Sequence, residues 1–231
     1  MENNENKLFI PGAIIVAGLI IAGAIVYVSG PRLAPPANNQ GNVEPSPSAA
    51  NAGEVLKVRN GDFYLGNPGA KVVIVEYGDY QCPFCGKWFK EVEPQIISNY
   101  VKTGKAVFIF RDFAFLGEES FRSAEAARCA NEQDKFWEYH DYLYSNQQGE
   151  NQGSFSDANL KKFAETLKLN TSAFNTCLDS GKYKQAVIDA SSEGRTVGVS
   201  GTPATFVNET MVSGAQPFAV FQSKIEAELK K

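Results

Sequence analysis

The stretch Glu76–Trp88, EYGDYQCPFCGKW, places Cys82 and Cys85 one helical turn apart, directly after an apolar run. That run, KVVIVEYGD, is rich in β-branched residues and predicts a short strand buried on both faces. Pro83 stands at the position where a helix would begin, so CPFCGKWFKEVEPQIISNYV predicts a helix, and Pro94 is expected to kink or interrupt it. The two cysteines therefore lie at a strand-to-helix junction.

Metal binding, a structural crosslink and reversible thiol–disulfide exchange are the three chemistries compatible with this spacing. Zinc needs about four ligands, and Cys129, Cys177 and His140, the only other cysteines and histidine, are widely separated in the sequence. A structural crosslink does not require a helix start, whereas a reactive thiolate is stabilised there by unpaired N–H groups and the helix dipole. We therefore favour thiol–disulfide exchange, with Cys82 as the exposed nucleophile and Cys85 as the buried resolving thiol, and expect no metal or cofactor.

The remaining elements predict an α/β fold in one domain. KAVFIFRDF reads as a second buried strand, so the first strand, helix and second strand form a βαβ unit with a parallel sheet. Helical spacing then continues through an insertion at about 117–195, in which Ser156 is a helix N-cap and Gly181 ends a helix. Strands at ATFVN and MVSGA and an amphipathic helix at PFAVFQSKIEAELKK complete the domain.

The N-terminal part of the chain differs in composition from the domain. Leu8–Val28 contains no charged residue, and as a helix it would be about 32 Å long, enough to cross a bilayer. We expect an uncleaved transmembrane anchor, preceded by a cytoplasmic segment 1–7; a cleaved signal peptide is the alternative. Lys7 before the span and Arg32 after it give only a small charge difference, which favours a domain outside the cell membrane. Residues 29–53 predict a Pro-rich, disordered tether.

Composition narrows the classes of partner. The formal net charge is −4 and no cluster of Lys or Arg is present, which argues against nucleic-acid binding. The 231-residue chain is 43% hydrophobic and has 16 Phe, enough to build a sizeable core. We therefore do not expect DNA or RNA as a partner.

A second motif, GVSGTPATFV, places Pro203 just before a strand, which indicates a turn or a cis bond there. With this motif, residues 54–231 resemble the DsbA-like disulfide oxidoreductases of the thioredoxin superfamily. The sharpest matches are VEYGDYQCPFC, AARCANEQDKFWEYHDYLY, FNTCLDSGKY and GVSGTPATFVN. The resemblance implies a thioredoxin fold with a helical insertion, and a redox site at Cys82-Pro83-Phe84-Cys85.

The resemblance also implies roles for residues around the cysteines. Pro203 would be cis and lie against the active-site disulfide, and the Thr202–Pro203 backbone would pair with an extended substrate segment. Glu76 would be a buried acid that relays protons for the inner cysteine; a strand-end side chain that reaches solvent is the alternative. Substrates would be reduced or unfolded secreted proteins, and electrons would pass to a membrane quinone-coupled oxidase of the DsbB or vitamin K epoxide reductase type.

This sequence differs from the DsbA pattern at two positions, and these differences leave the direction of electron flow open. DsbA has Cys-Pro-His-Cys, and Phe84 removes a donor to the thiolate. Thr202 before Pro203 is associated with isomerase-like relatives as well as with some oxidases. A disulfide-forming enzyme is our main interpretation; a reductase or isomerase, and a non-catalytic binder of unfolded segments, are the alternatives.

Five further residues complete the sequence-based expectations. An even number of cysteines in an external domain favours a structural disulfide between Cys129 and Cys177, each on an apolar helical face, with two buried free thiols as the alternative. Asp79 and Tyr80 are expected at the rim of the site. His140, spaced with apolar residues on one helical face, is interpreted as a core or capping histidine.

Overall fold

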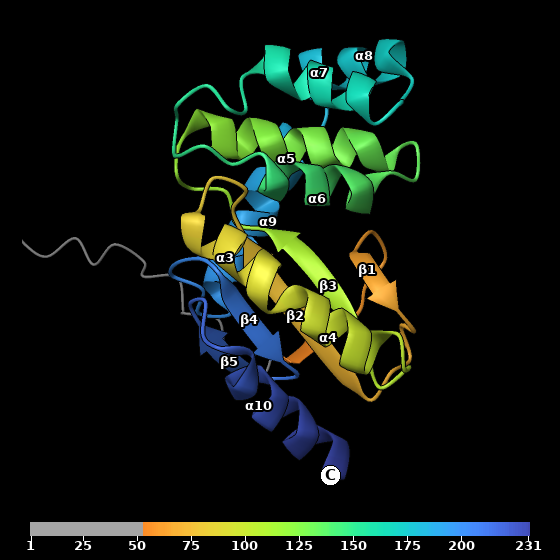
Figure 1. The fold of residues 1–231 in the computed structure, drawn as a ribbon, viewed down its shortest axis with the longest axis vertical. Helices are drawn as coiled ribbons and strands as arrows, with labels where there is room; N and C mark the ends of the chain where they lie inside the picture. Colours follow the sequence, from red (N-terminus) through yellow and green to blue (C-terminus); the bar gives the residue numbers. More distant parts are fainter. Residues whose placement is uncertain (1–52) are drawn as a thin grey trace, which may run out of the picture. The chain divides into compact units, whose positions relative to one another are not determined.

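A five-stranded mixed sheet with strand order β1-β3-β2-β4-β5 forms the centre of the computed structural model, which describes residues 53–231 (Figure 1). The predicted segment 1–7, the anchor at 8–28 and all of the tether except Gly53 lie outside the described residues and stay predictions. In the described part of the chain, no helix combines the length and the apolar composition that crossing a membrane requires.

Two parallel strands, β2 (Val72–Gly78) and β3 (Ala106–Asp112), lie at the middle of the sheet. All seven residues of β3 are buried, and so are all residues of β2 except Val73, which is half-buried. Strands covered on both faces require continuous apolar runs, which is the pattern that the sequence shows. Both predicted strands and their parallel pairing are confirmed.

The helix predicted after β2 is present and is interrupted as expected. α3 (Pro83–Glu91) starts with Pro83 in its first turn, and α4 (Glu93–Ile96) starts one residue after α3 ends. Pro94 lies in the first turn of α4, where a missing N–H removes no helical hydrogen bond. The π-helix η1 (Ile97–Val101) then leads towards β3.

The two faces of the sheet pack against different partners. Ile74 and Phe108 belong to a core cluster that includes residues of α3 and of α10 (Phe218–Lys230). Val75 and Ile109 belong to a second cluster on the other face. Because side chains alternate along a strand, the face of any β2 residue follows from its position relative to Ile74.

The edge strands contain one element that the sequence analysis missed. β4 (Ala204–Val207) is antiparallel to β2, and β5 (Thr210–Ser213) is antiparallel to β4, so the predicted hairpin is confirmed. β1 (Phe63–Gly66) pairs antiparallel with β3. It was missed because it is only four residues long and half-exposed, so its sequence lacks a continuous apolar run.

Five helices between β3 and β4 form the predicted insertion, at one end of the sheet (Figure 1). They are α5 (Glu118–Asn131), α6 (Phe136–Ser145), α7 (Asp157–Thr166), α8 (Thr171–Asp179) and α9 (Lys184–Thr196). Ser156 is the N-cap of α7, as predicted. Gly181 follows α8 with a φ of +63°, a conformation that favours glycine and ends helices.

A disulfide between Cys129 of α5 and Cys177 of α8 crosslinks this insertion, with the two Cα atoms 5.9 Å apart. Both residues are buried in the apolar cluster that fills the insertion. This is the pairing expected from the sequence. The two cysteines are bonded in this structure, so the alternative of two free buried thiols is not observed for them.

Removing this bridge should destabilise the domain without changing its redox site. The bridge closes a loop across a sequence separation of 48 residues, so the double variant Cys129→Ala/Cys177→Ala should lose about 2–5 kcal/mol of unfolding free energy. Chemical denaturation of both proteins measures the loss. Non-reducing peptide mapping of the unaltered chain should recover a Cys129–Cys177 peptide pair; finding both thiols free to alkylate would contradict the bridge.

Candidate active site

Cys82 and Cys85 occupy the start of α3, at the carboxyl end of β2. Cys82 is the N-cap residue, with extended backbone angles, and its carbonyl accepts a hydrogen bond from the Gly86 N–H at 3.1 Å. Cys85 is fully buried, as predicted. Cys82 is only 5% exposed, so the prediction of an exposed nucleophile was wrong; the Thr202 carbonyl lies 3.4 Å from its Sγ and helps to cover it. Phe84, in contrast, is 62% exposed.

The surroundings of the two thiols move their pKa values in opposite directions. The pKa of Cys82 falls from 9.0 to about 6, mainly because the Cys85 thiol hydrogen-bonds to it, with further help from the N–H groups of Cys85 and Phe84. Burial raises the pKa of Cys85 well above its usual value, and the hydrogen bond to Cys82 raises it further. At neutral pH one thiol is therefore a thiolate and its neighbour keeps its proton.

The Thr202–Pro203 peptide bond is cis, as the resemblance implied, and its segment lies against Cys82. When Cys82 is protonated, its thiol donates to the Thr202 carbonyl, with Sγ and the oxygen 3.4 Å apart. The Pro203 carbonyl accepts a hydrogen bond from the Gly214 N–H at 2.8 Å, which fixes the segment to the residue after β5. Residues 120 positions apart in the sequence thus form one site.

Glu76 is fully buried, on the same sheet face as Ile74, and the alternative of a solvent-reaching side chain is wrong. Neither of its carboxylate oxygens has a hydrogen-bond partner. Burial raises its pKa well above the usual 4.5, and the negative charges of Glu93 and Cys82 raise it further. Glu76 in turn contributes to the raised pKa of Cys85. This coupling places an acid with a raised pKa within electrostatic reach of both thiols, where it can exchange a proton with Cys85.

The loop before Cys82 is held by a polar cluster that the sequence analysis did not identify. Asp79 accepts hydrogen bonds from the Gln81 N–H at 2.9 Å and from the Ser120 hydroxyl at 2.7 Å, and from two N–H groups of the loop after β3. The Gln81 side chain donates to Ser120 at 2.9 Å and to Asn151 at 3.3 Å. The expectation that Asp79 lies at the rim was wrong: it is 1% exposed, because these donors surround it.

Tyr80 was also expected at the rim and is buried instead, at 1% exposure. Its ring packs against Phe110 and Tyr144, and its hydroxyl lies 3.1 Å from Nδ1 of His140. His140 is fully buried among these aromatic rings, as the core interpretation predicted. Spacing alone could not indicate the Tyr80–His140 contact, since the two residues are 60 positions apart.

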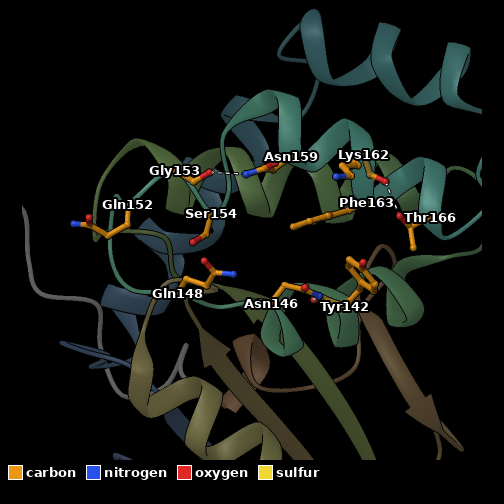
Figure 2. A pocket seen from close by; sticks show the side chains of 10 residues that line it. All are labelled: Tyr142, Asn146, Gln148, Gln152, Gly153, Ser154, Asn159, Lys162, Phe163 and Thr166. Atoms are coloured by element: carbon orange, nitrogen blue, oxygen red, sulfur yellow. Dashed lines mark hydrogen bonds between the residues drawn. The ribbon is translucent and has the colours of Figure 1, made fainter.

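Gln147, in the loop after α6, donates from Nε2 to the Cys82 carbonyl at 3.0 Å and also to the Tyr80 carbonyl. The same loop forms part of a polar pocket of about 320 Å³ between α6 and α7 (Figure 2). On one side of this pocket, Asn159 from α7 donates to the Gly153 carbonyl at 2.8 Å. None of the predicted site residues lines the pocket, so the redox chemistry belongs to the cysteines and not to this cavity.

Replacing Glu76 should separate the two steps of disulfide exchange. Glu76→Gln keeps the shape of the protonated acid but cannot accept the Cys85 proton, so the resolving step should slow by about 100-fold while attack at Cys82 changes little. Rapid-mixing measurements of mixed-disulfide formation and decay give both rates. Glu91→Gln, an exposed change on α3, is the matched control. If the mixed disulfide decays at the same rate in Glu76→Gln and in the unaltered chain, Glu76 has a purely structural role.

Several known proteins are similar to this chain in sequence and in structure. The family model described as Thioredoxin matches residues 59–227. The probable disulfide bond formation protein D of Bacillus cereus is 32% identical over 171 residues, which cover 72% of this chain and 78% of the relative. The corresponding Bacillus anthracis protein is 28% identical over 233 residues, covering 99% of each chain.

Two solved structures extend the comparison to the fold. BdbD from Bacillus subtilis, in its oxidised form, has a TM-score of 0.68 at 26% identity and covers 73% of this chain and 92% of its own. Wolbachia pipientis alpha-DsbA1 has a TM-score of 0.70 at 22% identity, covers 78% of this chain and 96% of its own, and is similar in fold. The chain thus belongs to the thioredoxin family and is a DsbA-like protein thiol–disulfide oxidoreductase.

Proposed function

We propose that this protein introduces disulfide bonds into reduced proteins outside the cytoplasm, using the Cys82-Pro83-Phe84-Cys85 site. In the oxidised enzyme, a substrate thiolate attacks Cys82 Sγ, the Cys82–Cys85 bond breaks and Cys85 leaves as a thiolate that takes up a proton. A second substrate thiolate then attacks the substrate sulfur of the mixed disulfide and releases Cys82 as a thiolate. The substrate gains a disulfide, and the enzyme gains two electrons and becomes reduced.

The main support for electron flow from the substrate to the enzyme is the lowered pKa of Cys82, at about 6. The thiolate exists only in the reduced enzyme, because a disulfide has no charge for the helix start and the Cys85 thiol to stabilise. Stabilising the reduced form makes the disulfide a better oxidant. A thiolate with a low pKa is also a good leaving group, which favours release of the oxidised substrate.

Exposed aromatic side chains next to the site support an unfolded protein segment as the substrate. Phe84 is 62% exposed within the motif, and Phe115 is 41% exposed in the loop that Asp79 fixes. Exposed apolar groups beside a reactive thiol suit segments whose apolar residues are not yet buried. The Thr202–Pro203 backbone beside Cys82 would pair with such a segment as an added strand.

The proposed location is supported by the sequence, and the proposed redox partner by the need to reoxidise the two cysteines. The uncharged run Leu8–Val28 supports a single membrane span with the N-terminus in the cytoplasm and the catalytic domain outside. Relatives named disulfide bond formation protein D support a role in disulfide formation. Reoxidation would then require a membrane oxidase that passes two electrons to a quinone, of the DsbB or vitamin K epoxide reductase type.

Thermal unfolding of the two redox forms tests the direction of electron flow. The Cys82 thiol has a pKa of about 6 in the folded reduced protein, against the ordinary value of 9.0 that stands for the unfolded chain. The stabilisation of the reduced form by the thiolate is therefore fully present above about pH 9 and is lost as the pH falls through about 6. The reduced full-length chain should therefore melt higher than the oxidised chain at pH 7–8, and the difference should shrink as the pH falls to 5. An oxidised form that melts higher at pH 7 would favour the reductase interpretation. A glutathione redox titration at pH 7 measures the same difference as a potential.

Phe84→His provides the matched variant for this measurement. An added imidazole donor should lower the pKa of Cys82 further and make the enzyme more oxidising, and the exposed position of Phe84 limits other effects on stability. Thiolate absorbance during a pH titration should give a Cys82 midpoint near 6 in the unaltered protein and a lower midpoint in the variant. An unchanged midpoint would show that residue 84 does not tune the thiolate.

Cys85→Ser should trap substrates. Without the resolving thiol, the Cys82 thiolate can attack a disulfide of a misoxidised, unfolded protein and release one substrate thiolate, and the mixed disulfide at Cys82 then persists. Non-reducing electrophoresis should therefore reveal covalent complexes that disappear on reduction. Cys82→Ser should form none, since Cys85 is fully buried. If Cys82→Ser retains full binding of unfolded segments and Cys85→Ser traps nothing, the protein acts as a non-catalytic binder.

A further inference from the structure

We propose that Glu93, His140 and Asp141 form a binding site for a divalent transition-metal ion, with Zn²⁺ as the best match. Glu93 comes from α4, and the other two residues come from α6. One ligand atom from each side chain lies within 4.8 Å of the other two. One imidazole and two carboxylates are a donor set that suits zinc and its first-row neighbours. This site is separate from the cysteines and does not depend on the proposed direction of electron flow.

The spacing of the two buried ligands fits a metal better than it fits a hydrogen bond. His140 Nε2 and Glu93 Oε2 are 3.6 Å apart, beyond the usual range of a hydrogen bond, and neither atom has a hydrogen-bond partner. Tetrahedral zinc with a nitrogen ligand at about 2.0 Å and an oxygen ligand at about 2.1 Å sets these atoms about 3.4 Å apart. A small movement of the Glu93 side chain is enough to close the difference.

Charge also favours a cation at this position. The Glu93 side chain is only 7% exposed, and a buried carboxylate without a counter-charge is costly. In residues 53–231, neither Glu93 nor Asp141 forms an ion pair with a lysine or arginine; His140 is the only basic partner of Glu93. Glu76 adds a third acidic group within electrostatic reach of Glu93. A divalent ion would supply the positive charge that these acids lack.

The surroundings of His140 hold its ring in the orientation that a ligand needs. Its Nδ1 lies 3.1 Å from the Tyr80 hydroxyl, and its ring packs edge-on against Phe110 with the centroids 4.6 Å apart. When Nδ1 carries the proton and donates to Tyr80, the lone pair of Nε2 faces Glu93, which is how outer partners orient metal-bound histidines. Asp141 is exposed, so it offers an entry path and leaves room for a water ligand.

The test uses the oxidised full-length chain, in which the Cys82–Cys85 disulfide removes the competing thiolates. After treatment with a chelator, titration with Zn²⁺ in a calorimeter should give one equivalent bound per chain, and Co²⁺ should produce visible absorption bands that Zn²⁺ abolishes. Glu93→Gln and Asp141→Asn should each weaken Zn²⁺ binding by at least about tenfold. Glu138→Gln, an exposed change on α6, and Asp189→Asn, an exposed change on α9, should leave it unchanged.

Three results would overturn the proposal. The first is no stoichiometric binding by the oxidised chain, which would leave Glu93 and His140 as a buried acid–base pair. The second is binding that all four variants retain equally, which indicates ions held at other surface groups. The third is binding only after reduction, which assigns the metal to Cys82 and Cys85. If circular dichroism shows that Glu93→Gln is unfolded, Zn²⁺ binding by Asp141→Asn still tests the proposal. The Asp141 side chain is exposed and forms no ion pair in the described residues, so its replacement should not unfold the domain.

Discussion

The redox site depends on the repulsion between acidic groups that are buried close to the two cysteines. The Cys82 thiolate forms near two carboxyl groups, Glu76 and Glu93, in surroundings from which water is largely excluded. Burial raises the pKa of Glu76, and repulsion by the charges of Glu93 and Cys82 raises it further. Burial is also the main reason why the pKa of Cys85 is raised. At neutral pH the Cys82 thiol therefore ionises, whereas the Cys85 thiol keeps its proton. Moving electrons through the cysteines therefore requires moving a proton beneath them.

The helical insertion takes part in building this site, although it contributes no reactive group. Ser120 and Asn151 bind the polar side chains of the loop before Cys82, and Gln147 binds the Cys82 carbonyl. The other side of Cys82 contacts the Thr202–Pro203 segment that leads into β4. The thiol is thus held between the sheet and the insertion, which explains why it is buried although it starts a helix. A rigid setting of this kind keeps the N–H groups aimed at the sulfur.

The four cysteines differ in function because of where they lie relative to helix ends. Cys82 is an N-cap, where free N–H groups and a neighbouring thiol stabilise its thiolate. Cys129 and Cys177 lie inside helices, among apolar side chains that offer a thiolate no such donors. A bond between them closes a loop across a sequence separation of 48 residues. The same residue type therefore serves as a reactive group in one setting and as a crosslink in another.

The sequence by itself determined the chemistry and every described strand except β1, because local patterns carry both kinds of information. Continuous apolar runs predicted β2 and β3, and a proline after Cys82 predicted the helix that activates it. The burial of Cys82, the polar cluster around Asp79 and the meeting of Glu93 with His140 were decided only by the tertiary structure. These features join residues about 40 to 120 positions apart. No periodicity within one segment encodes such contacts, since they arise when separate helices and strands pack together.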